Sequence, residues 1–228
     1  MAFTLYIVAT PIGNLKDISE RARQVLSSVP IVLSEDTRRT RILMSHLGIS
    51  PQLISYHHHT SLARLKSILD LLVKHDMALV SDAGTPGIND PGGKLVAEAM
   101  RRFGEELRVV PVPGPCALVV AASVSGFPMD EFTFMGFPPH KKGRQNFFNQ
   151  VAATSGSVVF YESPHRIVKA LTALSERDPE RLILVARELT KQFETLYRGS
   201  AISLAARLSS NPPPGEYVVV VSPRSYKE

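Results

Sequence analysis

The sequence contains a single cysteine among its 228 residues. One cysteine excludes a disulfide-stabilised scaffold and a cysteine-rich zinc site, and it is typical of a reducing compartment. The sequence also lacks any run of about 18 apolar residues, the length that spans a membrane. Its N-terminus has neither the basic segment nor the small-residue cleavage site of a signal peptide. These absences predict a cytoplasmic protein without a membrane segment.

Two common nucleotide-binding motifs are missing as well. The pattern G-x-x-x-x-G-K-[ST] does not occur, which argues against a P-loop NTPase. No G-x-G-x-x-G follows the first apolar segment, where ATPIGN stands instead at residues 9–14, so the ordinary dinucleotide-binding fold is not indicated either.

The composition is that of a soluble globular chain, with 44% hydrophobic and 21% charged residues. It excludes a disordered chain, a collagen and a coiled coil. The net charge is +5 and the sequence pI is about 9.4. This balance permits a polyanionic partner without requiring one.

Strand-like and helix-like segments alternate through the first half of the chain. Strands are predicted at residues 3–9, 31–33, 53–56, 77–81 and 107–110, and helices at 18–29, 37–47, 61–74, 94–103 and 117–125. Asp17 and Glu20 have the spacing of a capping box for the first helix. This alternation predicts a parallel α/β sheet with right-handed crossovers.

The second half alternates less regularly and predicts a mixed sheet. Strands are expected at residues 132–137, 157–161, 182–186, 194–198 and 217–221, and helices at 143–153 and 200–208. A further helix is expected to have Ser163 as N-cap and Pro164 as its first residue. We therefore expect two α/β domains, residues 1–115 and 116–228, joined near 112–128.

Four loops rich in glycine, proline or polar residues follow predicted strands, at residues 9–15, 81–93, 111–117 and 161–166. In open α/β sheets, ligands bind beyond the carboxyl ends of the strands. Glycine lets a ligand approach the backbone and proline stiffens the loop. One such loop is more often only a turn, but four together predict a cleft for a nucleotide-like or otherwise polar ligand.

Other polar segments point less directly to function. The triplet His57–His59 has no acidic or cysteine partner at ligand spacing and is better explained as a loop. Cys116 is better explained as a small packing residue than as a nucleophile. The charged clusters at residues 35–39 and 187–191 follow strands, and ion-paired helix starts explain them equally well. The basic residues of 140–144 and Arg38, Arg39 and Arg41 could contact phosphates, although a solvated charged face is the simpler explanation.

Seven motifs together resemble one family. They are LYIVATPIGNLKDIS, SEDTRRTRILMSHLGI, ALVSDAGTPGINDPG, VPVPGPCA, FYESPHR, ARELTK and GEYVVVV, in this order and over nearly the whole chain. The ordered set is similar to the bacterial 16S rRNA (cytidine) 2′-O-methyltransferases of the tetrapyrrole methylase superfamily. The resemblance implies a class III methyltransferase with two α/β domains, S-adenosylmethionine in the cleft between them, and a homodimer. The implied substrate is the ribose of a cytidine in the decoding region of 16S rRNA, within the small ribosomal subunit.

The resemblance also implies which positions contact the cofactor. These are Pro11, Gly84, Thr85, Pro86, Gly87, Ile88, Cys116, Ala117, Tyr161, Leu189, Gly215 and Glu216. Thr85 stands where the wider superfamily often has aspartate.

Methyl transfer to a hydroxyl needs an aligned acceptor and a base that removes its proton. From their positions at strand ends, Asp36, Glu162, Glu188 and Lys191 are predicted to face the methyl group. Glu188 or Asp36 would be the base, and Arg187 or Lys191 would orient the nucleotide. No metal is needed for this reaction.

Two alternatives stay open. A related methylase could act on a corrin-type tetrapyrrole or on a modified histidine of a translation factor, although the basic balance and the SEDTRRTR segment favour RNA. A catalytically inert RNA-binding module would need no small-molecule cleft, and it would not be stabilised by S-adenosylmethionine.

Overall fold

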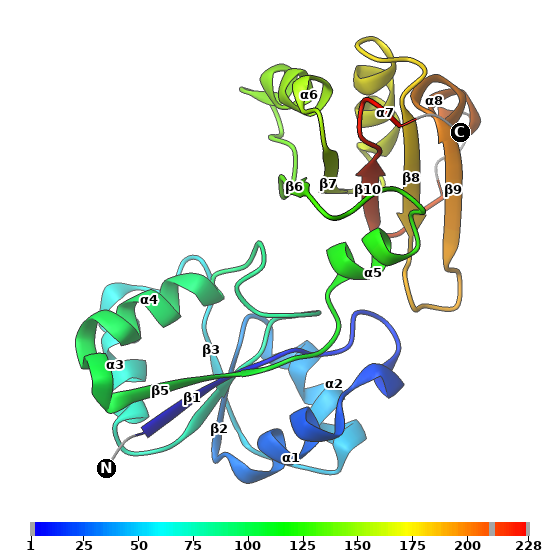
Figure 1. The fold of residues 1–228 in the computed structure, drawn as a ribbon. Coiled ribbons are helices and arrows are strands. Elements are labelled where there is room, and N and C mark those ends of the chain that lie inside the picture. The colour runs from blue at the N-terminus through cyan, green and yellow to red at the C-terminus, as the bar shows by residue number, and fades with distance from the viewer. Residues whose placement is uncertain (1–2, 210–212, 227–228) are drawn as a thin grey trace. The chain divides into compact units, whose positions relative to one another are not determined.

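The structure, a computed structural model, describes residues 3–209 and 213–226. The chain folds as two compact units, Met1–Cys116 (unit 1) and Ala117–Glu228 (unit 2), each with its own hydrophobic core (Figure 1). Over the described ranges, no helix is both long and apolar enough to cross a membrane.

Unit 1 is a parallel five-stranded sheet with the strand order β3-β2-β4-β1-β5. Its strands are β1 (Phe3–Val8), β2 (Ile31–Ser34), β3 (Gln52–Ser55), β4 (Met77–Leu79) and β5 (Leu107–Val112). Its longer helices are α1 (Glu20–Ser28), α2 (Thr37–Leu47), α3 (Leu62–Leu72) and α4 (Gly92–Phe103). The predicted parallel α/β sheet is confirmed.

Helices cover both faces of this sheet because side chains alternate along each buried strand. Leu5 of β1 belongs to the cluster that includes Leu65 of α3 and Leu95 of α4. Val8, three residues on, belongs to the cluster on the other face, with Leu26 of α1. Figure 1 shows α3 and α4 on one side of the sheet and α1 and α2 on the other. Since both faces are covered, only the strand ends are left for a ligand.

Capping residues set the start of α1 and the end of α2. The N-cap of α1 is Ser19, whose Oγ accepts a hydrogen bond from the backbone N–H of Ala22 at 3.1 Å. The predicted capping box at Asp17 is wrong, because Asp17 lies in a separate 3₁₀ turn, η1 (Leu15–Asp17), and a second capping residue follows it. Helix α2 has its predicted bounds and ends at Gly48, whose φ of 71° is left-handed.

Unit 2 is the predicted mixed sheet, with the order β6-β7-β10-β8-β9. Only β6 and β7 are parallel. Its strands are β6 (Phe132–Phe134), β7 (Ser157–Glu162), β8 (Leu182–Arg187), β9 (Thr195–Ser200) and β10 (Tyr217–Val221). Strand β6 is shorter than predicted, because Gly136 takes a φ of 63° soon after it ends.

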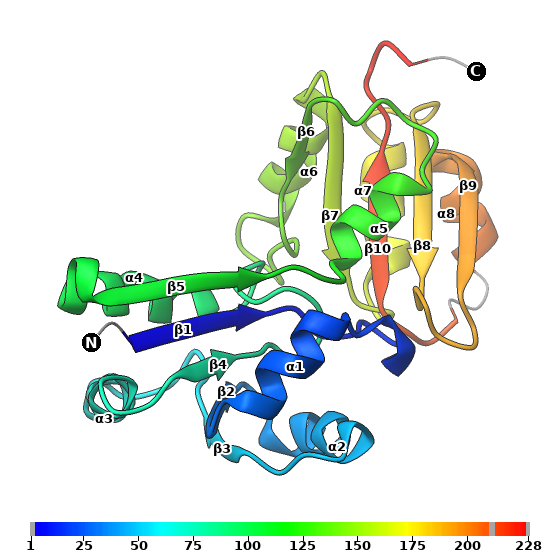
Figure 2. The ribbon, with the colours of Figure 1, turned by 60° about the horizontal axis from the view of Figure 1, so that its bottom comes forward.

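Helices also cover both faces of the second sheet. The helices α6 (Arg144–Ala153), α7 (Ile167–Ser175) and α8 (Ala201–Ser209) form one core with the sheet, and the short helix α5 (Ala117–Ser123) packs on β7 and β10 (Figure 2). The predicted start of α7 at Ser163 and Pro164 is wrong. Residues 163–166 form a turn instead, in which Ser163 Oγ accepts a hydrogen bond from the side chain of Arg166, the N-cap of α7.

A buried arginine ties unit 2 together. The side chain of Arg181, which precedes β8, is 4% exposed. Burial lowers the pKa of this guanidinium, and its N–H groups donate to backbone carbonyls. The acceptors are Val151, Ala152, Thr154, Gly156 and Ser222. One side chain therefore connects the end of α6, the start of β7 and the residue after β10.

Candidate active site

Three glycine- and proline-rich loops meet at the carboxyl edge of the unit 1 sheet. They follow β1, β4 and β5, which are neighbours in the sheet. Thr10 and Gly84 exchange two backbone hydrogen bonds, of 2.9 and 3.1 Å. The hydroxyl of Thr85 donates to the carbonyl of Pro115 at 3.0 Å. The structure thus brings the predicted loops 9–15, 81–93 and 111–117 into contact with one another.

Close approach of these loops depends on two glycines. Gly84 has a φ of 83°, and a Cβ there would lie 3.3 Å from Ile12 Cγ2. A Cβ on Gly114 would lie 3.0 Å from the Cβ of Ala9. A larger residue at either position would push the loops apart, so the backbone itself forms much of this edge.

Asp90, which is not among the predicted site residues, fixes the fold of the longest of these loops. Its Oδ1 accepts hydrogen bonds from the N–H of Gly87 at 2.8 Å and of Gly92 at 2.7 Å. An aspartate inside a glycine-rich loop is a signal for such a side-chain-to-backbone turn. Pro86 and Gly87 lie within the loop, and Ile88 presents a 39% exposed apolar side chain.

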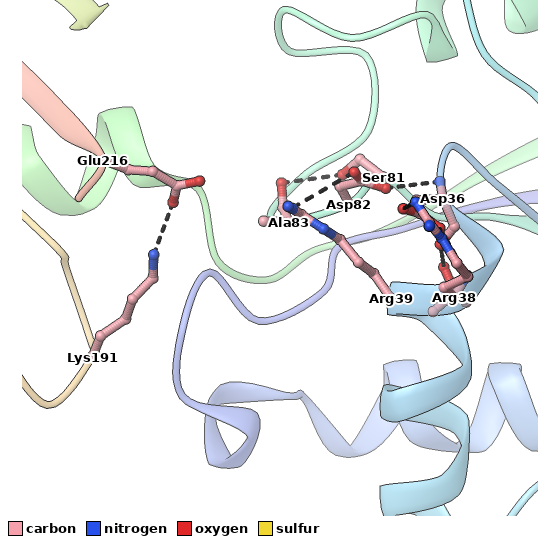
Figure 3. A network of polar contacts seen from close by, with 9 residues as sticks. Asp36, Arg38, Arg39, Ser81, Asp82, Ala83, Lys191 and Glu216 are labelled. Carbon is pink, nitrogen blue, oxygen red and sulfur yellow. Dashed lines mark hydrogen bonds and ion pairs between the residues drawn. The ribbon is translucent and has the colours of Figure 1, made fainter. Parts of the chain in front are cut away.

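The charged residues after β2 form an ion-paired helix start (Figure 3). Asp36 caps α2 by accepting a hydrogen bond from the N–H of Arg38, and Arg38 Nη2 lies 2.8 Å from Asp36 Oδ2. The side-chain hydrogen bonds from Arg38 lower the pKa of Asp36 to about 2. Asp82 accepts from the N–H of Asp36 and lies 3.7 Å from Arg39. A carboxylate held in this way is a weak base.

The neighbouring carboxyl behaves in the opposite way. Burial raises the pKa of Glu35, and the negative charges of Asp82 and Asp90 raise it further. The pKa values of these two consecutive acids therefore shift in opposite directions, because Asp36 has a cationic partner whereas Glu35 is partly buried and faces like charge.

Three motifs of unit 2 meet at one edge of its sheet. Tyr217, the first residue of β10, pairs with Glu162 at the end of β7 and with Arg187 at the end of β8. The segments 161–166, 187–191 and 215–217 are therefore neighbours. All three segments carry predicted site residues, but the register that makes them neighbours is not visible in the sequence.

The loop after β8 is held by a carboxylate–ammonium–carboxylate network, of which Figure 3 shows the contact between Lys191 and Glu216. Lys191 Nζ donates to Glu188 Oε1 and to Glu216 Oε2, both at 2.9 Å, and the N–H of Glu216 donates to Glu188 Oε1 at 2.8 Å. Glu188 and Thr190 have φ values of 51° and 65°. Non-glycine residues adopt this conformation only where their surroundings fix it.

The network sets the protonation of its members. Burial opposes the charge on Glu188, but the N–H of Glu216 and the ammonium of Lys191 outweigh it and lower the pKa of Glu188. Burial likewise opposes the charge on Lys191, and the two carboxylates outweigh it and raise the pKa of Lys191. Gly215 is required here, because a Cβ there would lie 2.5 Å from Glu188 Cγ.

Arg187 and Leu189 belong to the framework of this loop. Arg187 donates to the carbonyls of Pro214 at 2.8 Å and of Phe193 at 2.9 Å, so its guanidinium closes the loop. Leu189 is buried.

Glu162 is enclosed within unit 2, and its side chain has no exposed surface. One carboxylate oxygen lies 2.9 Å from Arg144 Nη2, and the other lies 2.9 Å from Arg166 Nε. The N–H of Ser163 also donates to it at 2.8 Å. Glu162 therefore holds two arginines, and its predicted place beside the methyl group stays a prediction.

The remaining predicted positions have simple surroundings. The ring of Tyr161 contacts Phe134 and Phe137. Cys116 is half-buried at the end of unit 1, and Ala117 begins α5 of unit 2. The triplet at residues 57–59 lies in a turn region, as predicted. Within the described parts of the chain, no group of three His, Cys, Asp or Glu residues is placed to hold a metal ion.

The sequence is similar to known methyltransferases along most of its length. The sequence profile of the tetrapyrrole (corrin/porphyrin) methylases matches residues 4–205. Ribosomal RNA small subunit methyltransferase I of Xylella fastidiosa is 45% identical, over 96% of this chain and 81% of the relative. The protein of the same name from Hydrogenobaculum sp. is 43% identical, over 96% of this chain and 95% of the relative.

Solved structures share the fold of the whole chain. Uroporphyrin-III-C-methyltransferase from Thermus thermophilus matches with a TM-score of 0.67 at 20% identity, over 96% of this chain and 94% of that one. A diphthine synthase matches with a TM-score of 0.76 at 11% identity, over 98% and 91%. At these identities the likeness concerns the fold alone.

Proposed function

Because the chain belongs to the tetrapyrrole (corrin/porphyrin) methylase family and is a methyltransferase, we propose that it methylates 16S rRNA. The proposed reaction moves a methyl group from S-adenosylmethionine to the ribose 2′-hydroxyl of a cytidine in the decoding region. The main support for this proposal is a sequence identity of 42–45% to three proteins named ribosomal RNA small subunit methyltransferase I, over at least 96% of this chain. The proposed setting is the small ribosomal subunit in the cytoplasm, with a homodimeric enzyme.

The carboxyl edge of unit 1 fits the chemistry of S-adenosylmethionine. This molecule presents charged amino-acid groups, a ribose and an adenine, which need backbone donors and acceptors and a flat apolar neighbour. Gly84 and Gly87 have positive φ and carry no side chain to obstruct the backbone, and Ile88 offers apolar surface. We assign cofactor contacts to Pro11, residues 84–88 and Cys116 in unit 1. In unit 2 we assign them to Ala117, Tyr161, Leu189, Gly215 and Glu216.

When bound, S-adenosylmethionine supplies a methyl group already activated by its positive sulfur. The protein must then align the ribose oxygen and accept its proton as the new bond forms. Glu188 is our preferred proton acceptor over Asp36, because Arg38 and the helix cap occupy both carboxylate oxygens of Asp36. The hydrogen bonds that Lys191 and Glu216 donate to Glu188 both fall on Oε1. Lys191 fixes the direction of the Glu188 carboxylate, and Arg187 fixes the loop.

Methyl transfer to small ribosomal subunits tests the proposed reaction. Subunits from cells lacking this modification should accept labelled methyl groups, and alkaline hydrolysis should leave one labelled, alkali-resistant dinucleotide. The resistance arises because a methylated 2′-oxygen cannot attack the neighbouring phosphate. Subunits that already carry the modification are the control and should accept none. Absence of transfer, with thermal stabilisation by S-adenosylmethionine demonstrated, would contradict the rRNA substrate and point to a tetrapyrrole or a modified histidine.

Variants of Glu188 and Glu216 test whether Glu188 acts as the base or only holds Lys191 in place. Glu188→Gln should lower kcat by about 100-fold, since general-base catalysis contributes that order, and should leave the affinity for S-adenosylmethionine unchanged. Glu216→Gln is the matched control, because Glu216 also binds Lys191 at 2.9 Å. It should raise the KM for S-adenosylmethionine, because Glu216 is an assigned cofactor contact, and it should retain most of kcat at saturating cofactor. In the wild type, kcat should fall only as the pH drops through the lowered pKa of Glu188, because the carboxylate is the active form. Equal losses in both variants would remove Glu188 as the base.

A further inference from the structure

A loop of unit 2 carries positive charge that no nearby acidic residue balances in the sequence. Residues 135–144, which we call the basic loop, join β6 to α6. The chain has no aspartate or glutamate between Glu131 and Glu162, whereas this interval contains Lys141, Lys142 and Arg144. His140, Lys141 and Lys142 are all exposed. The loop therefore presents concentrated positive charge to solvent.

An exposed aromatic ring lies in the same loop. Phe137 is 48% exposed, a costly position for a large apolar side chain. Its ring centroid lies 5.4 Å from that of Tyr161, which in turn lies 5.0 Å from Phe134. These tilted and edge-on ring contacts support Phe137 from one side and fix its position in the loop that carries the lysines.

The end of the basic loop is anchored to the interior of unit 2. Arg144 is paired with buried Glu162 at 2.9 Å, and its guanidinium carbon lies 5.1 Å from the centroid of the Phe148 ring. Arg144 also donates to the carbonyl of Pro139 at 3.4 Å, and its N–H donates to the carbonyl of Lys141 at 3.2 Å. The lysines thus project from a backbone that is already ordered, which lowers the entropic cost of binding.

Three other exposed arginines of the chain have acidic partners. Arg38 pairs with Asp36, Arg101 with Glu98, and Arg102 with Asp70. By contrast, among residues 3–209 and 213–226 no ion pair involves Lys141 or Lys142. Their charge remains available to an anionic partner.

We propose that the basic loop binds single-stranded RNA, with Lys141 and Lys142 on phosphates and a nucleobase stacked on Phe137. The proposal rests on the proposed function and adds to it the surface that holds the substrate. Positive charge beside an exposed aromatic ring is the chemistry that recognises unpaired nucleotides, because every base offers a face for stacking and every linkage a phosphate. Binding of this kind holds the RNA without reading its sequence.

The test measures binding of the full chain to a fluorescent single-stranded RNA of about 20 nucleotides across a range of salt concentrations. The double variant Lys141→Glu, Lys142→Glu should weaken binding by about tenfold or more, and should reduce the slope of log affinity against log salt by about 1.4, for two lost phosphate contacts. The matched control is Lys66→Glu, Lys74→Glu. Both control lysines are exposed, and they give the same change of net charge.

A second pair of variants tests the aromatic contact. Phe137→Ala should weaken binding by about tenfold through loss of stacking, with an unchanged salt slope. Phe132→Ala, also exposed but at the start of β6, should stay near wild type. Equal losses for the two lysine pairs, equal losses for the two phenylalanines, or no RNA binding by the wild type would each overturn the proposal.

The outcomes also separate this inference from the proposed reaction. RNA binding that depends on the basic loop, without methyl transfer to small subunits, would leave the inference standing and contradict the proposed function. Methyl transfer by the Lys141→Glu, Lys142→Glu variant with an unchanged KM for small subunits would support the proposed function and contradict the inference. Thermal stabilisation by S-adenosylmethionine, measured for every variant, establishes that each one is folded.

Discussion

Replacing Arg181 with methionine is expected to destabilise unit 2 by about 4 kcal/mol, because a buried carbonyl that loses its donor costs about 1–3 kcal/mol. The Arg181 side chain is 4% exposed and donates to five backbone carbonyls from three parts of the unit. Methionine fills a similar volume and donates nothing. Lysine would keep the charge, but it cannot reproduce the planar fork that reaches carbonyls on several sides.

Hydrogen exchange localises this effect. In Arg181→Met the amides of β10 should exchange at much lower free energies of opening, while the amides of β1 keep their wild-type protection. The control is Arg224→Met, which removes an exposed arginine from the same unit and should change stability by less than about 0.5 kcal/mol. Similar losses in the two variants would show that the carbonyl contacts contribute little.

Replacing Glu162 with glutamine is expected to cost about 3–5 kcal/mol, the range for breaking a buried ion pair by removing one partner. The amide has almost the same shape, but it leaves Arg144 and Arg166 without their shared counter-charge. Arg166 is the more vulnerable, because within the described residues its buried Nη1 has no hydrogen-bond partner. A drop in the free energy of unfolding, measured in urea, checks the expectation.

An exposed ion pair of the same unit provides the comparison. Glu176 lies 3.7 Å from Arg177 and its side chain is 64% exposed. Glu176→Gln should therefore cost less than about 1 kcal/mol. If Glu162→Gln cost no more than this, the burial of its carboxylate would have no energetic importance. Since Arg144 anchors the basic loop, Glu162→Gln should also weaken RNA binding beyond the Glu176 variant.

Hydrophobic pattern predicted most of the fold, because each element leaves a local signal. The alternation of buried strands and amphipathic helices gave the parallel sheet, and α2 and β10 have their predicted bounds. The strand order was not predictable in this way. Strand β4 enters between β2 and β1, and that choice depends on pairing between segments far apart in the sequence.

The loops of the candidate site could be predicted from the sequence, but the surroundings of its charged residues could not. Glycine, proline and polar residues after the predicted strands indicate the edge of a parallel sheet, and the structure brings these loops together there. The same pattern could not reveal that Asp36 is held by Arg38 or that Glu162 is enclosed between two arginines. The sequence of a motif does not show whether a carboxylate faces a substrate or a neighbouring cation. Only the residues around it in the folded structure distinguish these two environments.

The position of β1 also constrains the order in which unit 1 can be completed during synthesis. Its two neighbours are β4, which begins at Met77, and β5, which begins at Leu107. Strand β1 leaves the ribosome before both of these strands, so one of its edges is unpaired until residue 77 has emerged and the other until residue 107 has emerged. A nascent chain paused between these points exposes an apolar strand edge, the surface most prone to pairing with another chain. The speed of translation across residues 77–112 therefore affects how much of the nascent chain aggregates before unit 1 is complete.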